Sequence, residues 1–321
     1  MKAIVQDKYG PPTVLRFDDV ATPVPGDDEV LVRVRASSVN ARDWHYMRGD
    51  PYIMRPSMGL TRPKQRIQGL DFAGVVEAVG AKVTRLRPGD EVYGMSLAAF
   101  AEYVCAGPEE VDLKPANLTF EQAAAVPVAA GTALGCLPDV DSGHRVLING
   151  ASGGVGTFAV QLARSLGAHV TAVCSARNAD QAVSLGADVV VDYAREDFTR
   201  GDARYDLVVD LVGNHSLGDL RRALAPDGTV VLSGGGVSTG GSLFGPMGLF
   251  IRGALASRVA RQKVLAPALK QSRATLATLR TLIEAGRMTP VIDRVYPLSD
   301  AAAAIRYLEV DHARAKVVLT V

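Results

Sequence analysis

The sequence predicts an α/β protein with two domains, one built on a doubly wound parallel sheet covered by helices and the other on a mainly antiparallel β-barrel. Three observations predict this fold. The chain has 321 residues, which is long for a single hydrophobic core. Short strand-like segments follow one another through residues 1–121. After residue 122 helical and strand-like segments alternate, as they do in parallel-sheet domains.

Half-buried strands dominate residues 1–121. Residues 29–36 alternate apolar and polar side chains, which is the period of a strand with one buried face. Pro88-Gly89-Asp90 is typical of a turn, because proline fixes one backbone angle and glycine tolerates a positive φ. Further strands are expected at residues 73–80, 91–94 and 100–104. Short strands at this spacing favour an antiparallel barrel.

Residues 122–264 read as alternating strands and helices. Strands are expected at residues 145–149, 169–174, 188–193, 205–213 and 229–234, with short helices ending at Gly186 and Leu224 between them. The first helix carries Phe158, Leu162 and Leu166 as an apolar stripe and ends at Gly167. Strands joined by short helices form a parallel sheet.

The C-terminal residues 265–321 are assigned to the first domain, because the strand-like residues 315–321 can return to its sheet. A helix is expected at residues 275–284. Residues 235–253 are rich in glycine and indicate a mobile loop. Residues 254–265 suggest a basic amphipathic helix, whose charged face fits solvent better than a membrane surface.

Composition and charge exclude several classes of protein. The formal net charge of +1 favours no nucleic-acid partner. The start of the chain has no apolar signal-peptide segment, and the uncharged run 123–137 is shorter than the roughly 18 apolar residues of a spanning helix. We therefore expect a cytoplasmic protein without a membrane partner.

Neither a disulfide framework nor a metal site is expected. Cys105, Cys136 and Cys174 show no paired spacing, and Cys174 lies in an apolar run, where a buried core thiol is the more frequent role than a catalytic one. The histidines are scattered, with no close cluster of histidine and cysteine: they are His45, His144, His169, His215 and His312.

A glycine-rich turn at Gly150-Ala151-Ser152-Gly153-Gly154-Val155-Gly156 carries the functional signal. It follows the apolar strand 145–149 and opens the amphipathic helix. In that context glycines let the backbone approach a pyrophosphate, and the helix N-terminus directs N–H groups at it. The second domain is therefore predicted to be a Rossmann-type domain that binds a dinucleotide.

The end of the second predicted strand indicates which dinucleotide is bound. NAD sites usually carry an acidic residue about 20 residues after the glycines. Ser175 and Arg177 stand in this region, and a hydroxyl and a guanidinium suit a 2′-phosphate. NADPH is therefore the expected cofactor. The alternative is that Ser175 caps the next helix and Arg177 is merely solvated.

Several motifs together resemble the medium-chain dehydrogenase/reductase superfamily, in its zinc-independent quinone oxidoreductase branch of zeta-crystallin-like and enone reductases. The resemblance covers essentially the whole chain. It rests on Met1-Lys2-Ala3-Ile4-Val5 with Tyr9-Gly10-Pro11-Pro12, Ser37-Ser38-Val39-Asn40-Ala41-Arg42-Asp43-Trp44, Gly69-Leu70-Asp71-Phe72-Ala73-Gly74-Val75-Val76, Arg87-Pro88-Gly89-Asp90-Glu91-Val92, Gly150 to Gly156, and Leu185-Gly186-Ala187-Asp188 followed by Tyr193.

The resemblance implies a GroES-like first domain, a homodimer and a set of cofactor contacts. Relatives that bind zinc have a cysteine where Asn40 stands and a His-Glu pair near Leu70-Asp71, so no metal ligands are expected there. The implied cofactor residues are Thr132, Ser152, Gly153, Gly154, Val155, Ser175, Arg177, Tyr193, Leu211, Gly234 and Lys316.

The predicted reaction is hydride transfer from NADPH to a quinone or to the C=C bond of an α,β-unsaturated carbonyl compound. Asn40 is expected to donate to the substrate oxygen or to orient the nicotinamide ribose. His45 and Tyr52 are candidate proton donors. For Asn40 the alternative is a backbone contact at a strand end, and for His45 an unpartnered surface position. The rival functions are a NADPH-binding protein with little turnover and an alcohol dehydrogenase.

Overall fold

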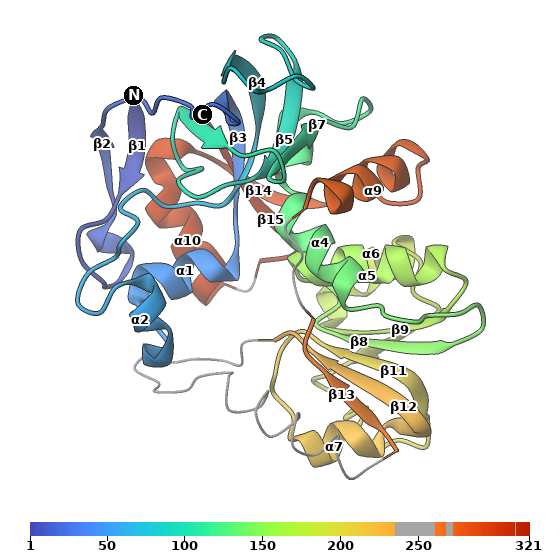
Figure 1. Cartoon of the computed structure of the whole chain (residues 1–321). Coiled ribbons are helices and arrows are strands. Elements are labelled where there is room, and N and C mark those ends of the chain that lie inside the picture. The colour runs from blue at the N-terminus through green and yellow to red at the C-terminus, as the bar shows by residue number, and fades with distance from the viewer. Residues whose placement is uncertain (235–260, 268–271, 312) are drawn as a thin grey trace. The chain divides into compact units, whose positions relative to one another are not determined.

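The computed structural model describes residues 1–234, 261–267, 272–311 and 313–321 (Figure 1). The chain divides by its internal contacts into unit 1, Met1–Gly131 with Lys270–Val321, and unit 2, Thr132–Leu269. We expected the first boundary ten residues earlier, after residue 121. Helix α3 (Phe120–Ala124) packs against the sheet of unit 1, which moves the boundary towards the C-terminus.

Among the described residues of unit 1, seven strands form one sheet that is antiparallel except at one edge. Its order is β14 (Ile292–Pro297), β15 (Lys316–Thr320), β3 (Val30–Val39), β4 (Asp71–Val79), β5 (Glu91–Met95) and β7 (Val111–Leu113), and β6 (Tyr103–Ala106) also pairs with β3. The pairing of β14 with β15 is parallel. Strands β1 (Lys2–Val5) and β2 (Arg16–Asp19) form a separate antiparallel pair. The predicted, mainly antiparallel first domain is confirmed.

The C-terminal strand returns to the N-terminal sheet, as expected. Strand β15 runs antiparallel to β3, with Val317 opposite Val39. Strand β14 has no clear signal in the sequence, because its side chains are exposed or half-buried and do not alternate. Helix α10 (Ala301–Val310) was not predicted either, because its alanine-rich start has no side-chain N-cap.

The other helices of unit 1 are short and follow local signals. Helix α1 (Ala41–Arg48) begins after Asn40 and ends at Gly49, whose φ of 62° is the left-handed conformation of a helix C-cap. Helix α9 (Arg273–Glu284) starts two residues earlier than expected. The remaining helices are η1 (Pro12–Val14), η2 (Tyr52–Met54), α2 (Arg55–Met58), η4 (Leu298–Asp300) and α4 (Pro127–Gly135), which runs into unit 2.

Unit 2 contains a parallel sheet of six strands in the part that the structure describes. The order is β10 (Val189–Asp192), β9 (His169–Cys174), β8 (Arg145–Asn149), β11 (Tyr205–Asp210), β12 (Leu224–Leu232) and β13 (Lys263–Leu265). From β8 the chain first winds to one edge and then, from β11, to the other. Figure 1 shows α5 (Gly154–Ser165) and α6 (Ala179–Ser184) on one face of the sheet and α7 (Leu217–Arg222) on the other. The short helix η3 (Ala176–Asn178) precedes α6. The Rossmann-type prediction is confirmed.

Three local expectations in unit 2 need correction. Leu166 is 44% exposed and caps α5 at its C-terminus, so the apolar stripe ends at Leu162. The helix expected to end at Leu224 ends at Arg222, and the strand expected from residue 229 begins at Leu224 as β12, whose pairing register with β11 shifts. Lys263–Leu265 is a strand, not the end of a basic helix, because it pairs with β12 and forms the edge of the sheet. The expected loop 235–253 and most of that helix lie outside the described residues.

No helix in the described part of the chain is both long enough and apolar enough to cross a membrane.

Candidate functional site

The glycine-rich turn of unit 2 connects β8 to α5 in a conformation that requires glycine. Gly150 has a φ of 88°, and the amides of Gly150 and Ala151 both donate to the carbonyl oxygen of Val173 at 3.1 Å. A Cβ on Gly156 would lie 2.2 Å from the Gly150 oxygen, so this glycine allows close packing of helix and strand. A Cβ on Gly153 would meet its nearest neighbour at 3.5 Å, so this position is open.

Helix α5 presents uncapped backbone amides at this turn. Its N-cap residue is Gly153, which has no side chain to accept a hydrogen bond from the first turn. The amides of Gly154 and Val155, in the first turn, have no partner within the helix, and the helix dipole is positive at this end. An anion is therefore stabilised at this helix N-terminus, which is formed by Ser152, Gly153, Gly154 and Val155. These residues fit the pyrophosphate of a dinucleotide.

The residues predicted to hold the adenosine end lie at the carboxyl ends of two adjacent strands. Ser175 follows β9, and Tyr193 follows β10 and donates its amide to the Cys174 carbonyl at 3.3 Å. Arg177 lies in η3 with an exposed side chain. Ser175 occupies the N-cap position of η3, but its side chain makes no capping hydrogen bond. The capping alternative for Ser175 therefore has no support.

The structure also brings Leu211 and Gly234 together. Both follow the carboxyl ends of neighbouring strands, and a Cβ on Gly234 would lie 2.5 Å from the Leu211 carbonyl carbon. Thr132 is a half-buried residue of α4. Its contact with the cofactor stays a prediction.

A buried polar network that the sequence analysis missed supports these strand ends. Asn149 donates from Nδ2 to Asp210 Oδ1 and to Asn214 Oδ1, both at 2.9 Å. The same Asp210 oxygen accepts the amides of Val212 at 3.1 Å and Gly213 at 3.0 Å. In the sequence, the available signal for this network was that Asn149 ends one predicted strand and Asp210 lies near the end of another. Only the pairing of β8 with β11 places the two residues opposite each other.

In unit 1 a buried cluster forms where β3 ends and β4 and β15 begin. We call it the Asp71 cluster: Ser38, Asn40, Asp71 and Lys316. The sheet register creates it, because Ser38 lies opposite Asp71 and Val39 lies opposite Val317, next to Lys316. Asp71 Oδ2 accepts from Ser38 Oγ at 2.8 Å, Asn40 Nδ2 at 3.0 Å and Lys316 Nζ at 3.4 Å.

The other oxygen of Asp71 is also bound. Asp71 Oδ1 accepts the amide of Val128, the second residue of α4, at 3.0 Å. A carboxylate at a helix N-terminus is stabilised by the unpaired amides and the helix dipole there. Asp71 is fully buried. Its hydrogen bonds connect its own strand, β4, to β3, β15 and the start of α4.

Lys316 is held inside this cluster. Its side chain is 3% exposed, and Nζ donates to Asn40 Oδ1 at 2.7 Å and the Val39 carbonyl at 3.3 Å, in addition to Asp71. These three acceptors match the three hydrogens of an ammonium group. Burial lowers the pKa of Lys316, and the negative charges of Asp71 and Asp43 oppose that effect. These bonds fix Lys316 against Asn40 and Asp71, and its contact with the cofactor stays a prediction.

The geometry narrows the roles open to Asn40. Both hydrogens of its amide are engaged, one by Asp71 and one by the Ser38 carbonyl at 3.3 Å. Donation to a substrate oxygen therefore requires one of these bonds to break. Oδ1 accepts one bond, from Lys316, and keeps a second lone pair. Oδ1 can therefore accept one further hydrogen bond, and the role of Asn40 towards substrate or ribose stays a prediction.

Asp43 lies beside this cluster as a buried acid. Its Oδ2 accepts the backbone amide of Asn40 at 2.8 Å, and its Oδ1 is buried without a hydrogen-bond partner among the described residues. Burial raises the pKa of Asp43 to about 7, although the bond from Asn40 acts in the opposite direction.

His45 and Tyr52 lie near each other in the chain, but neither is hydrogen-bonded to the Asp71 cluster in the described residues. The His45 ring stacks on Trp44 at 3.7 Å, and its Nδ1 lies 3.0 Å from the Asp50 carbonyl oxygen. Because a carbonyl only accepts, Nδ1 carries the hydrogen and Nε2 is a bare acceptor in the neutral ring. Burial lowers the pKa of His45, which favours that neutral form. Tyr52 lies in η2 with an exposed ring, 4.4 Å from the Arg55 guanidinium.

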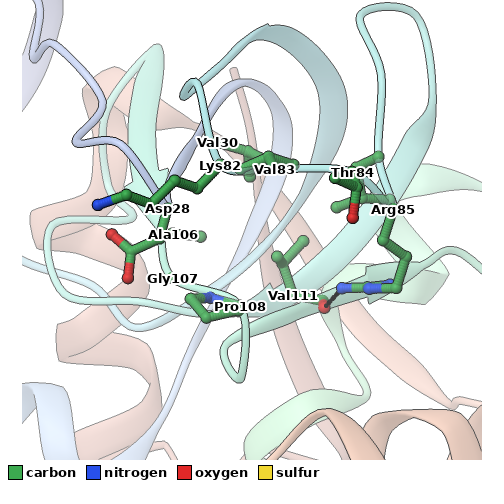
Figure 2. A pocket seen from close by; sticks show the side chains of 11 residues that line it. Asp28, Val30, Lys82, Val83, Thr84, Arg85, Ala106, Gly107, Pro108 and Val111 are labelled. Atoms are coloured by element: carbon green, nitrogen blue, oxygen red, sulfur yellow. Dashed lines mark hydrogen bonds between the residues drawn. The ribbon is translucent and has the colours of Figure 1, made fainter.

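A well-formed pocket of unit 1 lies elsewhere. It has a volume of 290 Å³, and Figure 2 shows Val30 and Val111 among the side chains that line it, with Arg85 at its edge. Val30 begins β3, whereas Asn40 follows the last residue of that strand, about 30 Å away along an extended strand. This pocket is therefore separate from the Asp71 cluster.

The described residues contain no group of three or more histidine, cysteine, aspartate or glutamate side chains placed to hold a metal ion. In the Asp71 cluster the carboxylate already binds the ammonium group of Lys316. A second cation at that carboxylate would be repelled by the first.

Comparison with known proteins agrees with this architecture. Residues 26–159 match the model of the alcohol dehydrogenase GroES-like domain, and residues 185–319 match that of a zinc-binding dehydrogenase. The chain is 32% identical to quinone oxidoreductase of Sus scrofa over 98% of this chain and 95% of that protein. It is 31% identical to 2-methylene-furan-3-one reductase of Solanum lycopersicum, over 99% of this chain and 79% of that protein.

A solved structure extends the similarity to the whole fold. Escherichia coli quinone oxidoreductase, complexed with NADPH, superimposes with a TM-score of 0.84 at 25% identity and full coverage of both chains. The fold, the glycine-rich turn and these relatives together show that the chain belongs to the medium-chain dehydrogenase/reductase superfamily, in the branch of quinone oxidoreductases and enone reductases.

Proposed function

We propose that this oxidoreductase uses NADPH, without zinc, to transfer hydride to a quinone or to the C=C bond of an α,β-unsaturated carbonyl compound. The observation that carries the proposal is the Asp71 cluster. An amide, a carboxylate and an ammonium group satisfy one another there, at the positions where the sequence lacks the zinc ligands of related alcohol dehydrogenases. Substrates that are already electron-poor need less activation of their carbonyl oxygen.

The preference for NADPH rests on Ser175 and Arg177. A hydroxyl and an exposed guanidinium at the carboxyl end of β9 suit a 2′-phosphate, whereas a carboxylate there would favour a ribose hydroxyl. The similar Escherichia coli enzyme was solved with NADPH. Both observations support NADPH over NADH.

Reduction of either substrate adds one hydride and one proton. Bound NADPH would supply the hydride. Of the two predicted proton donors, neutral His45 has its hydrogen on Nδ1, directed at Asp50, whereas Tyr52 is an exposed residue. The geometry therefore favours Tyr52 or solvent as the proton source. We assign Asn40 to holding the nicotinamide ribose through the free lone pair on Oδ1.

A substrate panel followed by NADPH absorbance tests the proposal. We expect turnover with 9,10-phenanthrenequinone or an alkenone, unchanged after treatment with a zinc chelator, and no oxidation of simple alcohols with NADP⁺. Loss of turnover with the chelator would contradict zinc independence. Tight NADPH binding with no turnover across quinones and enones would instead support a NADPH-binding protein with a structural or interaction role.

A further inference from the structure

A buried asparagine contacts the glycine-rich turn from the neighbouring segment of unit 2. Asn178 ends η3, and its side chain is 3% exposed. Its Nδ2 donates to the Ser152 Oγ at 2.9 Å, although the two residues lie 26 positions apart in the chain. Its Oδ1 is buried with no hydrogen-bond partner among the described residues. The bond to Ser152 is therefore the contact that fixes this amide.

The direction of that bond decides what the Ser152 hydroxyl can do. A serine hydroxyl has one hydrogen to donate and two lone pairs that accept. Because Asn178 donates to Oγ, it occupies a lone pair and leaves the hydroxyl hydrogen for another acceptor. Ser152 immediately precedes Gly153, the N-cap of α5, where the uncapped amides favour an anion. Phosphate oxygens are such acceptors.

We propose that Asn178 is a positioning residue for the dinucleotide, which holds the Ser152 hydroxyl so that its hydrogen is donated to the pyrophosphate. The proposal rests on the proposed NADPH site and adds to it a residue that does not itself touch the cofactor. The backbone of Asn178 is bound as well, because its amide donates to the Ser175 carbonyl at 2.9 Å. Asn178 thus connects the expected 2′-phosphate segment to the pyrophosphate turn.

The chemistry of asparagine suits this position. An aspartate would have no N–H to donate, would accept the Ser152 hydrogen itself and would place a negative charge beside the phosphates. An alanine would leave the hydroxyl free to rotate. Both changes should weaken nucleotide binding, and aspartate should weaken it more.

The pyrophosphate is common to NADH and NADPH, and this gives the test its specificity. A residue that acts through Ser152 should lower the affinity for both nucleotides by the same factor. A residue that acts on the 2′-phosphate should lower the affinity for NADPH alone. Arg177→Ala supplies the second pattern for comparison.

The experiment measures Kd for NADPH and NADH by nucleotide fluorescence with the full-length protein. The variants are Asn178→Ala, Asn178→Asp, Ser152→Ala and the Asn178→Ala/Ser152→Ala double variant. Because one hydrogen bond is lost, Asn178→Ala should raise the Kd for both nucleotides about five- to tenfold. The double variant should bind no more weakly than Ser152→Ala alone, because the effect of Asn178 passes through that hydroxyl.

Gln181→Ala is the matched control. Gln181 lies three residues further on, in α6, and also has a buried amide nitrogen, but it makes no bond to Ser152. Its Kd values should equal those of the wild type. Asn178→Asp preserves the side-chain shape, so it tests the proposal even where Asn178→Ala fails to fold, and melting of the free protein monitors folding.

Three outcomes would overturn the proposal: unchanged Kd values in both Asn178 variants, a loss confined to NADPH, or losses that add in the double variant. A wild-type protein that binds neither nucleotide would refute the proposed cofactor itself. If the wild type binds both nucleotides and the Asn178 variants bind them equally well, only the role of Asn178 is refuted.

Discussion

The buried pair of Asp71 and Lys316 predicts a large and non-additive effect on stability. Asp71→Asn removes a carboxylate that accepts hydrogen bonds from Ser38, Asn40, Lys316 and the Val128 amide. It leaves the buried ammonium group of Lys316 without its ion-pair partner. Lys316→Met in turn leaves the buried carboxylate of Asp71 without its ion-pair partner. Breaking a buried ion pair at one partner costs about 3–5 kcal/mol. Each single variant should lose free energy of unfolding of that order.

The double variant Asp71→Asn/Lys316→Met should recover much of this loss. Removing both charges leaves no unpaired charge in the core, and a neutral replacement of a buried ion pair is often tolerated. If the double variant loses no more free energy of unfolding than one single variant, the coupling free energy in the double-mutant cycle is at least about 3 kcal/mol. Burial already lowers the pKa of Lys316, so the charged lysine itself is destabilised by this environment.

The chain contains one tryptophan, Trp44, and it reports on the correct region. It lies in α1 of unit 1, four residues after Asn40. Urea unfolding followed by Trp44 fluorescence therefore measures unit 1, while circular dichroism follows the whole chain. Single variants that lose less than about 1 kcal/mol, or losses that simply add, would refute the assignment of a coupled buried pair.

Three further predictions concern pH dependence, the turn and cofactor choice. Folding raises the pKa of Asp43 from 3.8 to about 7, so the folded state binds a proton more tightly than the unfolded state, and the free energy of unfolding falls by up to roughly 4 kcal/mol between pH 4 and 8. Asp43→Asn should not show this fall. If the difference in free energy of unfolding between variant and wild type, measured with urea, is the same at both pH values, the prediction is wrong. Gly156→Ala should impair folding, because its Cβ would lie 2.2 Å from the Gly150 oxygen. Gly153→Ala should have the melting temperature of the wild type but bind the nucleotide more weakly. Equal melting temperatures for the two variants would contradict these roles of the two glycines. Arg177→Glu should raise the KM for NADPH at least about tenfold and leave that for NADH nearly unchanged, and steady-state kinetics with an unchanged NADPH KM would remove Arg177 from the phosphate site.

The local patterns of the sequence were sufficient to predict the Rossmann-type unit and its glycine-rich turn. The turn, its strand and its helix are contiguous in the chain, and glycine is required where Gly150 adopts a positive φ. Ser175 and Arg177 could be assigned to the cofactor site because they follow a recognisable strand. The strand β13 was missed because three residues at a sheet edge carry too short a pattern.

Tertiary structure alone decided how the polar residues of the site are used. The antiparallel pairing of β15 with β3 directs the ammonium group of Lys316 to Asp71 and Asn40, and no local pattern indicated these contacts. The bond from Asn178 to Ser152 likewise joins residues 26 positions apart. The sequence by itself determined the contiguous elements with a clear local pattern, such as the glycine-rich turn and the strand and helix beside it, since these depend on neighbouring residues. Hydrogen-bond partners depend on strand order and register, which only the folded chain establishes.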